Sequence, residues 1–156
     1  VTAMLMILAP LKRLTDVSAP IQRGLAAAES VFALIDALCT GQQGEALRLL
    51  DRLLSDGQPP LVVLTMLTRH FRQLWKTRAL LAQGVSQKEL PRRIGINPYF
   101  LGNLMTQANR YSDEQLRDIY PRLLAVDQAL KSGGDPRGYL EGLLFALTAR
   151  SAGECQ

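Results

Sequence analysis

The stretch PLVVLTMLTRHFRQLWKTRALLAQG, residues 60–84, decides the fold expected for this chain. Its apolar side chains recur at spacings of three and four residues, which is the period of one face of an α-helix. The stripe consists of Leu64, Leu67, Phe71, Leu74 and Leu81, with Arg78 on the same line and Trp75 beside it. Pro60 suits a first helical turn and Gly84 suits a helix end. The stretch therefore predicts one long helix that forms the spine of the fold.

Helical patterns also precede this stretch. From Ser18 to about Cys39, apolar residues again follow at spacings of three and four. After Gly41 and Gly44, residues 45–54 carry leucines on one face and charged residues largely on the other, which is typical of a short amphipathic helix. We expect two helices before the central one.

Polar and proline residues after the stretch mark further helix starts. The pairs are Ser86 with Glu89, Asn97 with Pro98, Ser112 with Gln115, and Asp135 with Pro136. The sequence thus predicts an all-α fold, a single bundle of about seven helices joined by short turns. We expect residues 1–17 to be irregular or partly helical, residues 18–149 to form the helical domain, and residues 150–156 to be a flexible tail.

The composition supports a folded helical domain. The chain has 156 residues, of which 47% are hydrophobic and 21% charged, so a sizeable core is expected. Aromatic residues reach only 6%, and long β-branched runs are missing, which favours helices over strands. The formal charge of +4 is spread along the chain and contains no basic run. This charge is compatible with a DNA contact but does not indicate one.

The N-terminal stretch and the cysteines indicate the cellular compartment of the protein. Val1 to Ala9 is apolar, but Pro10 ends it well short of the roughly 20 residues of a membrane span. Nothing resembles a signal peptide. Cys39 and Cys155 are too few for a disulfide framework or a zinc site. We therefore expect a cytoplasmic protein without a membrane span.

No pattern in the chain predicts catalysis. Phosphate-binding and dinucleotide-binding glycine loops are missing from the sequence. His70 is the single histidine and lies beside the core stripe, where a structural role fits better than a catalytic one. Neither cysteine has a base placed near it in sequence. We assign no catalytic residue, no cofactor and no metal ligand, and expect no intrinsic enzymatic activity.

The central helix carries the clearest surface candidates. Arg69, Arg72 and Lys76, together with Arg78, could meet phosphates, but a solvated face is the commoner fate of such residues. Its aromatic residues Phe71 and Trp75 could pack in the core or anchor an interface, because aromatic residues are enriched at binding hot spots. The sequence leaves both pairs of alternatives open.

A series of short runs, taken in order, resembles the C-terminal region of the bacterial DNA polymerase III delta subunit over residues 31–149. The most specific of them is DQALKSGGDPR at residues 127–137, which precedes a leucine-rich helix. The other runs are VFALIDA at 31–37, EALRLL at 45–50, GQPPL at 57–61, RQLWK at 72–76, ALL at 79–81, GINP at 95–98 and YS at 111–112.

This resemblance implies a helical collar domain of a clamp loader. Such a domain packs with the other clamp-loader subunits, the motor subunits and delta-prime, in a hetero-pentamer that loads the sliding clamp onto primed DNA. The expected function is therefore assembly in DNA replication. Phe71, Trp75, Lys131 and Arg137 are the candidate interface residues, with a solvated surface as the alternative for Lys131 and Arg137.

Residues 1 to about 35 instead resemble the end of the transmembrane region of lipid A exporter-type ABC transporters. The resemblance rests on PLKRLTD at residues 10–16 and QRGLAAAESVF at residues 22–32. It implies an alternative function, a truncated membrane-associated exporter fragment without its nucleotide-binding domain. A third alternative, a small helical enzyme, lacks a visible set of acid, base and nucleophile.

Overall fold

The computed structural model describes residues 26–151 of the chain, and every regular element in that range is a helix. The first helix is described over residues 26–39. The later elements are α2 (Gln43–Ser55), α3 (Pro60–Ala82), α4 (Leu90–Ile94), the 3₁₀-helix η1 (Pro98–Phe100), α5 (Leu101–Ala108), α6 (Asp113–Ser132) and α7 (Pro136–Ser151). The predicted all-α fold is confirmed.

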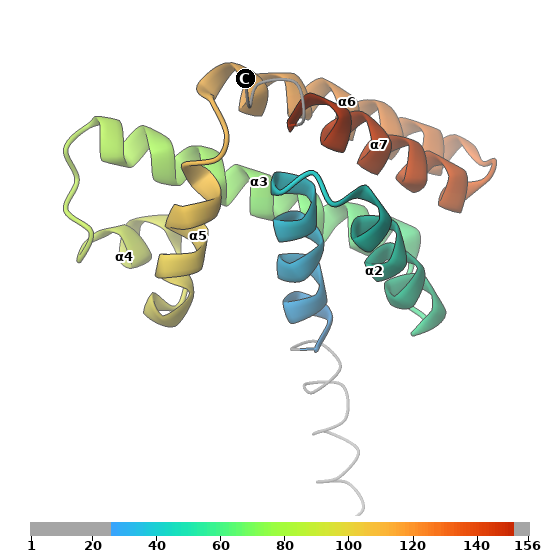
Figure 1. Cartoon of the computed structure of the whole chain (residues 1–156), viewed down its shortest axis with the longest axis horizontal. Helices are drawn as coiled ribbons and strands as arrows, with labels where there is room; N and C mark the ends of the chain where they lie inside the picture. Colours follow the sequence, from blue (N-terminus) through green and yellow to red (C-terminus); the bar gives the residue numbers. More distant parts are fainter. Residues whose placement is uncertain (1–25, 152–156) are drawn as a thin grey trace, which may run out of the picture.

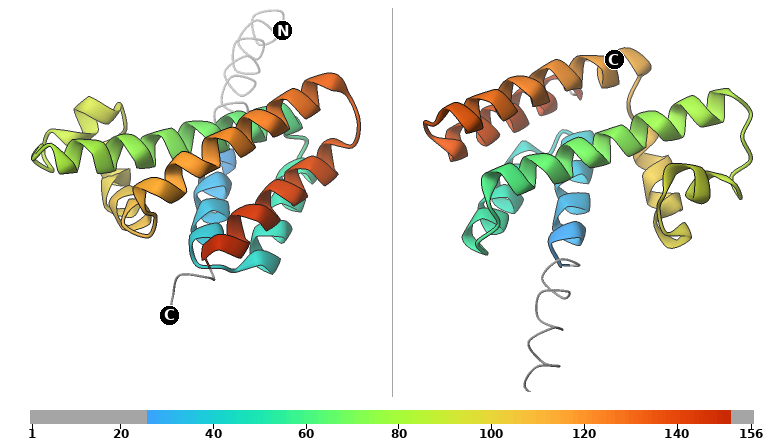
Figure 2. Two further views of the ribbon diagram at one scale, coloured as in Figure 1. Left: turned by 90° about the horizontal axis from the view of Figure 1, so that it is seen from above. Right: turned by 180° about the vertical axis from the view of Figure 1, so that it is seen from behind.

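Helix α3 lies at the centre of the arrangement (Figure 1). It contacts α4 and α5 toward one end of the molecule and packs along α6 over much of its length. Helices α6 and α7 form a hairpin, and α7 also packs on α2 (Figure 2). The predicted spine of the fold is therefore the helix that holds the two ends of the molecule together.

Helix α3 begins and ends where Pro60 and Gly84 predict. Pro59 is extended and Pro60 is the first helical residue. Beyond the last turn, Gly84 adopts φ +77°, a left-handed conformation that glycine tolerates best. This lets the backbone N–H of Val85 donate to the carbonyl oxygen of Leu80 at 3.1 Å.

Two further helix starts are formed as predicted. At the start of α6, the Gln115 backbone N–H donates to Ser112 Oγ at 3.1 Å, and the Ser112 N–H donates to Gln115 Oε1 at 2.8 Å. This is the reciprocal capping box. At the start of α7, the Arg137 N–H donates to Asp135 Oδ1 at 3.1 Å. These caps satisfy N–H groups that a helix start leaves without partners.

The helix start predicted from a side-chain cap between Ser86 and Glu89 is wrong. These residues close a turn, in which the Glu89 N–H donates to the Ser86 carbonyl oxygen at 3.0 Å. Helix α4 begins only at Leu90 and has no side-chain cap. Leu90 and Pro91 are both buried, and proline has the φ of a first helical turn. Packing and proline geometry thus set this start.

The first helix is part of the core. Ala27, Val31, Leu34 and Ile35 are all buried. The two family resemblances overlap at about residues 31–35, so they meet inside a helix that packs in the bundle. The prediction for residues 1–17 concerns residues outside the described range, and so does most of the prediction for the tail. Helix α7 continues to Ser151, two residues past its expected end at residue 149.

None of the described helices is long and apolar enough to cross a bilayer. The apolar stretch from Val1 to Ala9 lies outside the residues to which this finding applies.

Candidate interaction groove

Helices α3 and α6 run antiparallel and leave a groove between them. The direction follows from their contacts, since Arg78 near the end of α3 reaches Asp113 at the start of α6, with Nε and Oδ1 2.7 Å apart. We name the cavity of about 840 Å³ between these helices the α3–α6 groove. Its lining residues are Leu64, Thr65, Thr68, Arg69, Arg72, Tyr120, Pro121, Leu123, Leu124 and Asp127.

An outer stripe of α3 borders the groove. Its members are Leu61, Thr65, Thr68, Arg72 and Trp75, again at alternating spacings of four and three residues. Leu61 is 41% exposed and Trp75 is 39% exposed. This second stripe was not predicted from the sequence, although the threonines at helical spacing are the signal that reveals it.

The groove is largely apolar. Leu64 and Leu123 are buried beneath it, whereas Leu124 on its edge is 58% exposed. The hydroxyls of Thr65 and Thr68 donate to the carbonyl oxygens of the preceding turn, at 2.7 and 2.8 Å. Because these donors are used within the helix, the two threonines do not require a polar partner in the groove.

The charges at the groove are positive on balance. Arg69 and Arg72 are exposed, and neither forms an ion pair with a carboxylate of a described residue. Asp127 is half-buried and already accepts from Lys131 Nζ at 2.6 Å. Burial raises the pKa of the Tyr120 hydroxyl, and the adjacent Arg72 guanidinium opposes that rise. The two arginines are thus the charges that remain available to a partner.

The structure separates the four predicted interface residues. Phe71 is completely buried against Tyr111, which is the core alternative that the sequence left open for this residue. Trp75 is partly exposed and packs against Tyr120, with ring centroids 5.3 Å apart. Lys131 Nζ donates to Asp127, which is one of the residues that line the groove.

Arg137 lies away from the groove. Its guanidinium contacts Asp51 on α2 at 2.9 Å and Glu141 on α7 at 2.7 Å. These ion pairs tie two helices of this chain together. An intersubunit role for Arg137 stays a prediction, and it would have to compete with these contacts.

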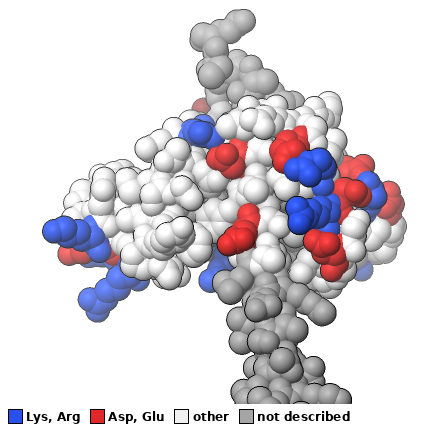
Figure 3. Space-filling view, turned by 60° about the horizontal axis from the view of Figure 1, so that its bottom comes forward, with Lys and Arg blue, Asp and Glu red and all other residues white. Residues whose placement is uncertain are grey.

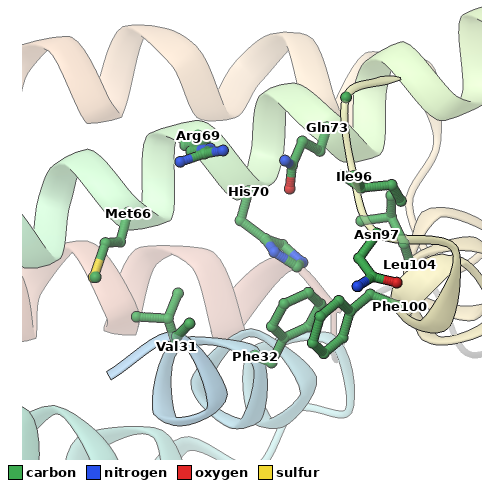
Figure 4. A pocket seen from close by; sticks show the side chains of 12 residues that line it. Val31, Phe32, Met66, Arg69, His70, Gln73, Ile96, Asn97, Phe100 and Leu104 are labelled. Atoms are coloured by element: carbon green, nitrogen blue, oxygen red, sulfur yellow. The ribbon is translucent and has the colours of Figure 1, made fainter. Parts of the chain in front are cut away.

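A second, smaller cavity of about 290 Å³ lies between α3, the first helix and the segment around Phe100, and Arg69 lines it as well as the groove. Figure 4 shows His70 pointing from α3 toward Phe32 and Phe100. The His70 ring meets Phe32 edge to face, with centroids 4.5 Å apart, and its Nε2 is 2.8 Å from Gln107 Oε1. Burial lowers the pKa of His70. A neutral histidine, held by the Gln107 amide and the Phe32 ring, packs here as a core residue.

The remaining reactive groups of residues 26–151 show no grouping typical of catalysis. Burial raises the pKa of the Cys39 thiol to about 11, which disfavours the nucleophilic thiolate at neutral pH. Within the described part of the chain, no cluster of histidine, cysteine, aspartate or glutamate could hold a metal ion.

The profile of the family described as "DNA polymerase III delta subunit, C-terminal domain" matches residues 28–147. This chain belongs to that family. The match covers the described bundle from its first helix almost to the end of α7.

Individual members of the delta family agree with this assignment. The DNA polymerase III subunit delta of Bacillus subtilis is 28% identical over 139 residues, which are 88% of this chain and 40% of that protein. The solved structure of the Bacillus subtilis DNA clamp loader delta protein aligns with a TM-score of 0.74 at 27% identity, covering 80% of this chain and 37% of that one. The chain thus spans less than half the length of these relatives.

A short segment is similar to a different family. The ATP-dependent lipid A-core flippase of Dechloromonas aromatica is 83% identical over 36 residues, which are 23% of this chain but 6% of the flippase. The flippase of Ralstonia nicotianae is 57% identical over 44 residues. Both resemblances stated from the sequence are confirmed.

Proposed function

We propose that this chain is an assembly module of a clamp loader in DNA replication, packing with motor subunits and delta-prime in a hetero-pentamer. The observation that carries this proposal is the TM-score of 0.74 to the Bacillus subtilis clamp loader delta protein over 80% of the chain. The proposed role is structural and requires no catalytic group. Such an assembly would form in the cytoplasm.

The exposed surface of the bundle supports an assembly role. Leu61, Trp75 and Leu124 expose between 39% and 58% of their surface along α3 and α6. Burying such side chains against a partner removes apolar surface from water, which is the main favourable contribution to most protein association. A rigid helical bundle can present these residues with little loss of conformational freedom on binding.

The alternative, a membrane-associated exporter fragment, rests on the 36 residues that are 83% identical to a flippase. The delta family accounts for 28–147, a far larger part of the chain. Sedimentation with phospholipid vesicles discriminates between the two, because the exporter fragment would pellet with vesicles and the assembly module would not.

The assembly proposal is tested by mixing the chain with purified motor and delta-prime subunits and measuring the mass of the complex by light scattering after size exclusion. Subunits from Dechloromonas aromatica are a suitable choice, given the 83% identity of one segment to a protein of that organism. We expect a hetero-oligomer of defined mass. If the chain elutes alone while full-length delta from the same source assembles, the proposal is wrong.

A further inference from the structure

We propose that the α3–α6 groove binds an amphipathic helix of a neighbouring clamp-loader subunit, and that carboxylates of this helix contact Arg69 and Arg72. This inference rests on the proposed assembly function. It adds the surface that makes the contact and the chemistry of the partner segment.

The dimensions of the groove suit a helix. Its walls run from Leu64 to Arg72 on α3 and from Tyr120 to Asp127 on α6. At a rise of about 1.5 Å per residue, each wall is roughly 10–12 Å long, or about two helical turns. A helix that lies in such a groove places side chains at positions i, i+3 or i+4, and i+7 against the walls.

The apolar surface of the groove provides the contact for such a helix. Leu124 and Pro121 are exposed on the α6 edge, and Leu61 extends the α3 edge beyond the groove. In the antiparallel arrangement, Leu61 and Leu124 lie toward the end of the groove where Leu64 and Asp127 are located, whereas Pro121 lies next to Tyr120 toward the other end. Leucine or similar side chains from one face of a partner helix would cover this end.

The two arginines define the charge of the partner. Arg69 and Arg72 are three residues apart, which places them one turn apart on adjacent positions of α3. Guanidinium groups bind carboxylates through paired, charge-assisted hydrogen bonds. Since Lys131 already neutralises Asp127, the groove favours a partner with aspartate or glutamate one turn apart.

Other occupants fit the groove less well. Nucleic acid is bound through rows of cations that follow the phosphates, whereas this groove combines two arginines with four leucine and proline side chains. A small ligand is usually enclosed by its site, but Leu124, Pro121 and both arginines are exposed here. A helix with an apolar face and an acidic edge matches both properties of the groove.

The test compares charge reversal in the groove with charge reversal beside it. The double variant R69E/R72E reverses both groove arginines, and R117E is the matched control, because Arg117 is an exposed arginine of α6 outside the groove lining. Fluorescently labelled chains are titrated with the motor and delta-prime subunits. We expect R69E/R72E to raise the Kd at least about tenfold and R117E to change it less than about threefold.

A third variant tests the apolar contact. Leu124→Asp introduces a carboxylate at a side chain that is 58% exposed, so the bundle should keep its fold. Circular dichroism melting checks this for every variant. We expect Leu124→Asp to weaken subunit binding to a similar extent as R69E/R72E.

The outcomes separate this inference from the function on which it rests. If the unmodified chain does not bind the subunits, the assembly proposal itself fails. If it binds and both groove variants bind equally well, the groove is not the docking site, although the assembly role stands. If R69E/R72E binds the subunits normally but loses affinity for primed DNA, the arginines serve nucleic acid and the inference is wrong.

Discussion

The α2–α7 end of the bundle and the α3–α6 groove use arginine in opposite ways. At the α2–α7 end, Arg48 pairs with Glu45 at 2.6 Å, and Arg137 pairs with Asp51 and Glu141. Figure 3 shows this end of the molecule with positive and negative side chains interleaved. At the groove, Arg69 and Arg72 have no carboxylate partner among the described residues.

This difference shows which charges serve the fold and which are available to another molecule. Exposed ion pairs contribute little to stability, but at the α2–α7 end they pair Arg48, Arg52 and Arg137 with carboxylates of this chain. The groove combines unmatched positive charge with exposed apolar surface, which is a combination that a partner can stabilise on binding. We therefore expect changes at the groove to alter binding, and changes at the α2–α7 end to alter stability slightly.

The largest expected effect concerns the core beneath the groove. Phe71→Ala should lower the free energy of unfolding by about 3–5 kcal/mol, because Phe71 is fully buried and its loss leaves a cavity under α3. Urea denaturation measures this. Trp75→Ala, one turn further along α3 and 39% exposed, is the control and should cost clearly less. Equal losses would mean that the two faces of α3 are not distinct.

A smaller effect is expected at the start of α6, which forms the second wall of the groove. Ser112→Ala removes the side-chain partner of the Gln115 N–H and should cost about 1 kcal/mol. Ser132→Ala at the other end of α6 is the control, since that hydroxyl bonds the carbonyl oxygen of Gln128 rather than a helix-start N–H. If the Ser112→Ala variant is as stable as the control, this cap does not stabilise the start of α6.

The stability of the bundle should depend on pH through His70. Its folded pKa is lowered by burial, so folding favours the neutral ring. This stabilisation is complete above the ordinary pKa of 6.5 and is lost as the pH falls below that value toward the folded pKa. His70→Gln should therefore lose less stability than the unmodified chain between about pH 7.5 and about pH 5.5. An equal loss of stability in the variant and the unmodified chain would show that His70 does not cause the pH dependence.

The smallest effect should appear at the surface arginines. Arg137→Ala removes two ion pairs and should lower the Tm slightly at low salt, with the difference shrinking at high salt. Arg69→Ala removes no ion pair with a described residue and should leave the Tm unchanged at both salt concentrations. A salt-dependent loss in the Arg69 variant would indicate that this arginine stabilises the fold.

Local signals in the sequence predicted local structure well. The bounds of α3 and the capping box at Ser112 follow from proline, glycine and polar residues that act within one turn. At Ser86 the same local pattern failed, because the burial of Leu90 and the geometry of Pro91 set the start of α4. A tertiary contact outweighed a side-chain cap there.

The site was harder to predict because it depends on which helices meet. Phe71 and Trp75 both looked like core or interface residues, and only the packing of α3 places one inside and the other outside. The partners of Arg137 include Asp51 on a distant helix, which periodicity does not reveal. The groove itself exists only because α6 lies antiparallel beside α3.

The α3–α6 groove, and not the α2–α7 end, is the surface at which we expect the partner to bind. Hydrogen exchange measured by mass spectrometry, with and without saturating motor and delta-prime subunits, tests this directly. Binding at the groove should slow exchange in peptides from α3 and α6 and leave exchange in peptides from α2 unchanged. Slower exchange in α2 and α7, with α3 and α6 unchanged, would contradict it.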